Sequence, residues 1–264
     1  MNRIEEKMTA LKNEGRKAFI TYTTAGLPDM ETTKKIMFAQ QEAGIDVMEL
    51  GIPFSDPVAD GSVIQAASYE AIQKGATLTK IFTLMKEVRK EGLTTPVVFM
   101  MYYNTVYHYG LEEFVEMCAD CGVDGLIIPD LPYEEQKEIN AVLAENEAAP
   151  ILIQLVSPVS KQRIPMIVNN ARGFVYCVSQ MGVTGNGTNF HKQIREYLLE
   201  VKKNSPVPVM MGFGIRTAGD VEPLEDIIDG AIVGSHFITL MKENNYDENV
   251  IKEYISSFKK EMNE

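Results

Sequence analysis

Long apolar runs are missing from this 264-residue chain. No stretch approaches the roughly 18 consecutive apolar residues that a membrane-spanning helix needs. The N-terminus (1–16) is charged and amphipathic without an apolar signal core, so we expect a cytoplasmic protein. Positive charge is also scarce, since 25 Lys and Arg face 37 Asp and Glu, a net charge of −12 at pH 7. This balance argues against nucleic acid and membrane surfaces as partners.

Cysteine and histidine are sparse, with three of each in the chain. An odd number of cysteines fits a reducing compartment better than a disulfide framework. Cys118 and Cys121 form a CxxC, but they close a predicted helix and no second pair completes a zinc site, so we interpret them as small buried core residues. His108, His191 and His236 show no metal-ligand spacing, and we interpret them as surface or capping groups.

Short β-branched runs alternate with helical patterns along most of the chain. Eight strands are predicted, at 18–22, 45–50, 96–101, 125–129, 151–155, 173–178, 207–211 and 231–233. A helix at 2–13 precedes the first strand, and a short helix at 235–242 follows the eighth. The pattern predicts one (β/α)₈ TIM-barrel domain over residues 1–264, with those two helices as additions. An open doubly wound sheet is the alternative, although such sheets usually have fewer strands.

The stretch from Glu49 to Gly61 (ELGIPFSDPVADG) holds the most informative acids. Glu49 lies at the end of the second predicted strand, and Asp56 and Asp60 follow in a loop punctuated by glycine and proline. The loop acids could simply form Asx-turns. A carboxylate on a buried strand, however, is costly unless it is paired or used. Because barrel active sites lie at the carboxyl ends of the strands, Glu49 and Asp60 are candidate acid–base groups.

Glycine-rich segments follow three later strands, at 182–185, 212–215 and 230–235. They could merely turn the chain, but the last two follow strands seven and eight, where barrels often bind phosphate through backbone N–H groups. A helix beginning at Ser235 would add its positive dipole end. The converging loops therefore favour a phosphate site, which would bind an anion despite the acidic net charge.

Several residue types are missing where other reactions would need them, which limits the class of reaction. No lysine lies in a predicted strand, so a Schiff-base aldolase lacks its nucleophile. The histidine spacing disfavours a metal-dependent aldolase, and no Gly-x-Ser-x-Gly elbow is present. What remains is general acid–base catalysis by carboxylates on a phosphorylated substrate.

The motifs resemble those of the tryptophan synthase alpha chain family. The resemblance is carried by the Glu49–Gly61 stretch with Gln65, by VDG at 123–125 with PDLP at 129–132, by YCVS at 176–179 with GVTG at 182–185, by GFGI at 212–215 and by VGS at 233–235. It extends in order from Phe19 to Phe237, and the acidic stretch is its most specific part.

The resemblance implies a barrel that cleaves indole-3-glycerol phosphate to indole and glyceraldehyde 3-phosphate. Glu49 would be the acid/base at indole C3, Asp60 would accept the indole N–H, and Tyr176 would complete the catalytic set. The implied substrate-binding residues are Tyr22, Met100, Ile128, Ile153, Thr184, Phe213 and Ile232, and the implied phosphate-binding residues are Gly185, Gly214, Gly234 and Ser235. No metal and no cofactor are implied for this chain. Its implied partner is a pyridoxal-phosphate-dependent beta chain in an alpha2-beta2 tetramer.

Four positions depart from the family pattern: no arginine follows Gly185, Arg216 stands where a small residue is usual, Ser62 replaces a proline, and His236 replaces a small residue. Two other functions stay open. The chain could be another phosphate-binding barrel, such as a sugar-phosphate isomerase or epimerase, or mainly an activating or channelling subunit with little activity of its own.

Overall fold

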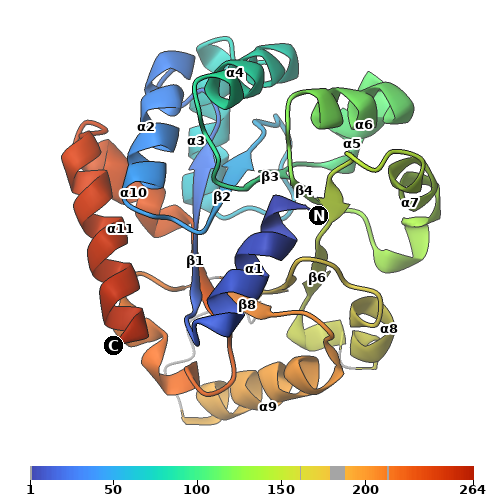
Figure 1. Ribbon diagram of the computed structural model, residues 1–264, viewed down its shortest axis with the longest axis vertical. Helices are drawn as coiled ribbons and strands as arrows, with labels where there is room; N and C mark the ends of the chain where they lie inside the picture. The colour runs from blue at the N-terminus through green and yellow to red at the C-terminus, as the bar shows by residue number, and fades with distance from the viewer. Residues whose placement is uncertain (1, 161, 179–187, 213) are drawn as a thin grey trace.

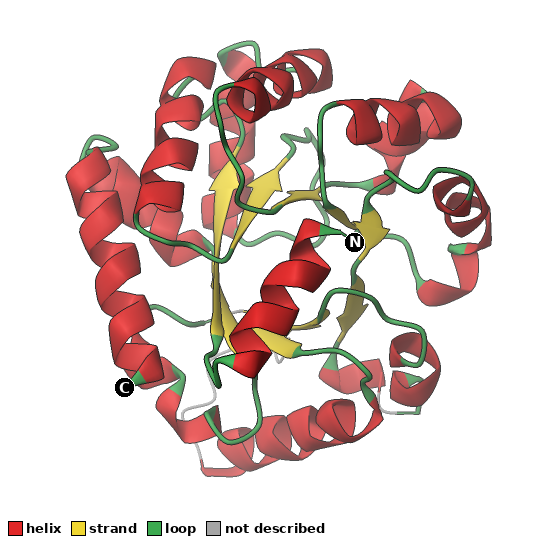
Figure 2. Cartoon of the chain, in the orientation of Figure 1, coloured by secondary structure: helices red, strands yellow, loops and turns green. Residues whose placement is uncertain are grey.

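Nine parallel strands form one sheet in the part of the chain that the computed structural model describes, residues 2–160, 162–178, 188–212 and 214–264. In chain order they are β1 (Ala18–Thr24), β2 (Val47–Gly51), β3 (Val97–Met100), β4 (Gly125–Ile127), β5 (Ile151–Leu152), β6 (Gln154–Val156), β7 (Val175–Val178), β8 (Val209–Gly212) and β9 (Gly230–Val233). Their order across the sheet is β5-β4-β3-β2-β1-β9-β8-β7-β6. Figure 2 shows the strands inside a ring of helices.

The two outermost strands in that order, β5 and β6, are consecutive parts of one extended segment divided at Ile153. β5 pairs with β4, and β6 pairs with β7, so this segment joins both sides of the sheet. The N–H of Ile153 still bonds to the carbonyl of Leu126 at 2.9 Å. The barrel therefore has eight strand positions, as predicted, with the fifth strand divided where its pairing changes sides.

The helices that surround the strands are α2 (Met30–Glu42), α3 (Ser62–Gln73), α4 (Leu78–Lys90), α5 (Tyr103–Tyr109), α6 (Leu111–Asp120), α7 (Lys137–Ala144), α8 (Ile164–Val168), α9 (Thr188–Asn204), α10 (Ser235–Glu243) and α11 (Glu248–Asn263). Short 3₁₀ turns are η1 (Tyr133–Glu135), η2 (Pro158–Ser160), η3 (Ala218–Asp220) and η4 (Glu222–Leu224). Between β8 and β9 the chain forms the two 3₁₀ turns η3 and η4 in place of a regular α-helix, and α5 was not predicted. The predicted helix at 235–242 is present as α10.

Helix α1 (Arg3–Asn13) covers the amino-terminal end of the barrel, where Figure 1 shows it crossing the strands. Asn2 caps it by accepting from the N–H of Ile4, and its side-chain amide donates to the carbonyl of Asp124 at 2.8 Å. Ile4 and Met8 are buried with the inward-facing side chains of the strands. Because this end is filled, the opposite end is left for a ligand.

An aspartate precedes each of three strands at the end that α1 covers. Asp46, Asp124 and Asp229 each accept a hydrogen bond from a backbone N–H of the preceding strand in the barrel. Each also pairs with a basic side chain from a surrounding helix. These carboxylates tie neighbouring strands together and anchor the helices to the barrel.

The CxxC cysteines are core residues, as predicted. Cys118 and Cys121 lie at the end of α6, and both are buried and free. No helix among the described residues is long and apolar enough to cross a membrane.

Candidate active site

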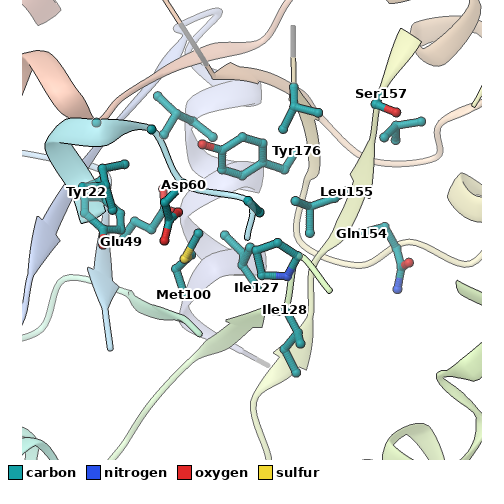
Figure 3. Close-up of a pocket in the computed structure, with 18 of the residues that line it drawn as sticks. Tyr22, Glu49, Asp60, Met100, Ile127, Ile128, Gln154, Leu155, Ser157 and Tyr176 are labelled. Carbon is teal, nitrogen blue, oxygen red and sulfur yellow. The ribbon is translucent and has the colours of Figure 1, made fainter. Parts of the chain in front are cut away.

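A cavity of about 810 Å³ opens at the carboxyl ends of the strands, opposite α1. Its walls come from nearly every strand or the loop that follows it. The residues include Tyr22, Glu49, Asp60, Met100, Ile127, Ile128, Gln154, Leu155, Tyr176, Gly214, Arg216, Ile232, Gly234, Ser235 and His236. Figure 3 shows the Glu49 and Asp60 side chains next to one another, with the hydroxyl end of Tyr176 directed toward them.

Glu49 projects from β2 into this cavity and is only 3% exposed. Its Oε2 atom has no hydrogen-bond partner among the described residues. Burial, and then the neighbouring charge of Asp60, raises the pKa of Glu49 from 4.5 to about 8. The carboxyl group is therefore protonated at neutral pH and ready to give a proton, as expected for a buried catalytic acid.

Asp60 lies in the loop between β2 and α3, and Tyr102 holds it in place. The Tyr102 hydroxyl donates to Asp60 Oδ2 at 3.0 Å and accepts from the N–H of Ala59 at 2.9 Å. Burial raises the pKa of Asp60, while the Tyr102 hydrogen bond acts in the opposite direction. Tyr102 thus both aims the carboxyl group and stabilises its charged form.

Two glycines make room for the cavity tyrosines. A Cβ at Gly51 would lie 1.9 Å from the hydroxyl oxygen of Tyr22, and one at Gly212 would lie 2.6 Å from the ring of Tyr176. Both tyrosines are buried, and burial raises the pKa of each above its ordinary value. They remain neutral and form a wall beside the two carboxyl groups.

Backbone groups line the part of the cavity that follows β8 and β9. Gly214, Gly234 and Ser235 all line it, with Gly214 in the left-handed region at φ +79°. Helix α10 begins at Ser235, and Gly234 at its N-cap has no side chain to bond the first-turn N–H groups. A helix N-terminus of this kind attracts anions such as phosphate.

Most of the predicted site residues that the structure describes meet at this cavity. Tyr22, Glu49, Asp60, Met100, Ile128, Tyr176, Gly214, Ile232, Gly234 and Ser235 all line it. Ile153 does not; it is 1% exposed and packs in the barrel interior with Ile4 and Ile151. Thr184, Gly185 and Phe213 lie outside the described residues.

Tyr102 and Gln154 stand at or near the ends of predicted strands, but neither received a role from the sequence. Tyr102 holds Asp60 in place. Gln154 lines the cavity and donates to buried Gln136 at 2.9 Å. His236, interpreted as a surface or capping group, is half-buried in the cavity wall. Among the residues that the structure describes, no three His, Cys, Asp or Glu side chains are grouped to hold a metal ion.

The fold and the cavity define the class: a TIM-barrel enzyme with a buried glutamate and a half-buried aspartate at the carboxyl ends of its strands. A family model described as tryptophan synthase alpha chain matches residues 8–264. A tryptophan synthase alpha chain from Lachnospira eligens is 74% identical over 263 residues, which cover 100% of both chains. One from Thermoanaerobacter sp. is 46% identical and covers 98% of this chain and 99% of its own.

The solved structure of tryptophan synthase subunit alpha from Legionella pneumophila is also similar, with a TM-score of 0.89, 32% identity and coverage of 99% of this chain and 98% of its own. The chain therefore belongs to the tryptophan synthase alpha chain family, the lyases of tryptophan biosynthesis that cleave indole-3-glycerol phosphate. The fold class and the function predicted from the sequence are confirmed. The isomerase or epimerase alternative has no support.

Proposed function

We propose that Glu49 is the acid/base and Asp60 the electrostatic partner in the cleavage of indole-3-glycerol phosphate by this chain. The observation that carries this assignment is the buried, unpaired carboxyl group of Glu49, whose pKa is raised to about 8, beside Asp60 in one cavity. Only a carboxyl group that is protonated at neutral pH can donate a proton to a weakly basic carbon.

The reaction follows from these two groups. Glu49 gives its proton to C3 of the indole ring, and the positive charge spreads to the ring nitrogen. Asp60 accepts the N–H hydrogen bond and stabilises this cation. Glu49, now a carboxylate, takes the proton of the hydroxyl group on the carbon attached to C3. The carbon–carbon bond then breaks, its electrons return to the ring, and indole and glyceraldehyde 3-phosphate leave.

The cavity walls support one orientation of the substrate. Tyr22, Met100 and Ile232 offer apolar surface near the carboxyl groups for the indole ring. Gly214, Gly234 and Ser235 would bind the phosphate through backbone N–H groups. We assign Tyr176 to the wall that orients the ring, and Thr184, Gly185 and Phe213 keep their predicted roles as proposals.

The test is the release of indole from indole-3-glycerol phosphate by the purified chain. We expect Glu49→Gln and Asp60→Asn each to lower kcat by at least about 100-fold, the usual size of a lost acid–base group. Glu253→Gln, an exposed position on α11, is the matched control and should behave as the wild type. Normal turnover by Glu49→Gln would remove this mechanism.

We further propose a beta-chain partner that holds pyridoxal phosphate, in an alpha2-beta2 tetramer in the cytoplasm; this chain itself would need no cofactor. Three large exposed apolar side chains support such an interface: Val58 (82% exposed), Tyr107 (74%) and Val159 (88%). All three belong to segments that follow the carboxyl ends of strands, the end where the cavity opens. Indole release that rises when a beta chain is added would support this partner.

A further inference from the structure

We propose that Arg216, positioned by Tyr254, is a phosphate-binding residue that determines how tightly this enzyme holds its substrate. The inference rests on the proposed function, because it needs a phosphate at the α10 end of the cavity. It adds a charged side chain to a rim otherwise built from backbone N–H groups.

The charge around the cavity singles out Arg216. Only two arginines and no lysine line it in the described residues, Arg163 and Arg216. Arg163 is paired with Glu134 through two hydrogen bonds, so its charge is already balanced. Arg216 takes part in no ion pair among the described residues, although its charge acts on the nearby carboxylate of Asp220. Among the described residues of this wall, Arg216 is therefore the arginine that is available to an anion.

Arg216 lies in the part of the wall that is proposed to bind phosphate. It follows Gly214 and Ile215 in the loop after β8, and all three line the cavity with Gly234 and Ser235. Glu49 comes from β2 and Asp60 from the loop after it, and β2 is not a neighbour of β8 in the barrel. A guanidinium group in the loop after β8 would attract the phosphate, and it can bind phosphate oxygens with two hydrogen bonds.

The backbone of Arg216 is held from two directions, while its side chain forms no hydrogen bond or ion pair among the described residues. Its N–H donates to Asp220 Oδ2 at 2.9 Å, and its carbonyl accepts from the Tyr254 hydroxyl at 2.8 Å. Asp220 also accepts from the N–H and the hydroxyl of Thr217, so the loop backbone occupies this carboxylate. A fixed backbone reduces the entropy that the side chain loses on binding.

Tyr254 connects this loop to α10. It lies on α11, where its ring packs against Phe237 and against His236, with ring centroids 5.7 Å apart in both cases. Its hydroxyl group is the donor to Arg216. Replacing Tyr254 by Phe keeps the ring packing and removes only this hydrogen bond. The substitution therefore separates a positioning role from a structural one.

The experiment measures the binding of sn-glycerol 3-phosphate by calorimetry at low salt, together with steady-state indole release, for the wild type, Arg216→Gln, Tyr254→Phe and the double variant. We expect Arg216→Gln to weaken glycerol 3-phosphate binding and raise KM about tenfold, the size of one charged hydrogen bond, with kcat within about threefold. Arg216→Lys should recover part of the loss, and binding of neutral indole should not change.

Tyr254→Phe should raise KM about threefold in the wild type but not in the Arg216→Gln background, because both changes remove the same interaction. Arg195→Gln, an exposed arginine on α9 paired with Asp226, is the control and should match the wild type. Unchanged glycerol 3-phosphate binding in Arg216→Gln, with normal indole release in every variant, overturns the inference and leaves the proposed function standing. A wild-type chain that releases no indole overturns both.

Discussion

Replacing Glu49 by Gln should abolish turnover and, at the same time, stabilise the fold. The pKa of Glu49 rises from 4.5 to about 8 in the folded protein. Between these two pH values the unfolded chain has lost the proton and the folded chain has kept it. The free energy of unfolding therefore falls as the pH rises through this interval, and Gln, which cannot ionise, escapes the loss.

The size of this loss follows from the difference between the two pKa values of Glu49. At about 1.4 kcal/mol per pH unit, the loss of unfolding free energy is absent below pH 4.5, reaches roughly 3 kcal/mol at pH 7 and levels off near 5 kcal/mol above pH 8. The Glu49 side chain is 3% exposed, so solvent screening reduces this free-energy difference only slightly. Any cost of burying the amide of Gln is the same at every pH, which leaves the slope unaffected.

Urea unfolding of the wild type and Glu49→Gln at several pH values between 5 and 9 measures this directly. We expect the difference in unfolding free energy to increase with pH up to about 8 and then to stay constant. Glu253→Gln, at an exposed position, should show a difference near zero throughout. A difference for Glu49→Gln that does not vary with pH would refute the raised pKa and the role built on it.

Three further substitutions test other parts of the structure. Tyr102→Phe removes the hydrogen-bond donor to Asp60, so the pKa of Asp60 should rise further. As a result, kcat/KM for indole release should fall about tenfold, and the acid limb of its pH profile should move to higher pH. Gly51→Ala brings a Cβ to 1.9 Å from the Tyr22 hydroxyl oxygen, and we expect Tm to fall by about 5 °C in a thermal scan. Asp124→Ala leaves two arginines and a strand N–H without their acceptor, so urea unfolding should show a loss of about 3–5 kcal/mol.

Each of these has a matched control. Tyr69→Phe changes an exposed tyrosine on α3 and should keep full activity. Gly219→Ala meets only an ordinary contact of 3.7 Å and should keep the wild-type Tm. Glu91→Gln breaks an exposed pair with Lys34 and should leave the free energy of unfolding close to that of the wild type. A control that loses as much as its partner would contradict the assigned contact.

The sequence predicted the barrel because its strands are buried on both faces and are separated by helical patterns. It predicted Glu49 because an acid on a buried strand is rare without a function, and Asp60 because it follows in the loop at the same strand end. It did not predict the division of the fifth strand at Ile153, since that break arises where the segment changes pairing partners. Nor did it predict α5, because the tyrosine-rich segment from Tyr103 to Tyr109 has little helical periodicity.

The sequence also did not predict how deep in the barrel each inward-facing side chain lies. Ile151, Ile153 and Leu155 are every second residue of one extended segment, so they face the barrel interior at successive heights along its axis. The first two pack beside α1, whereas Leu155 reaches the cavity. The resemblance named Ile153 as a wall residue, one level deeper than the cavity that the structure shows. The hydrogen bond from Tyr102 to Asp60 joins residues 42 positions apart, which only the fold brings together.

The most direct test is a crystal structure of the Glu49→Gln variant with indole-3-glycerol phosphate bound. It should place the indole N–H within hydrogen-bond distance of Asp60, C3 beside the amide at position 49, and the phosphate on the N–H groups near Gly214, Gly234 and Ser235. An indole ring bound away from Asp60, or a phosphate seated beside the two acids instead of at α10, would contradict the assignment.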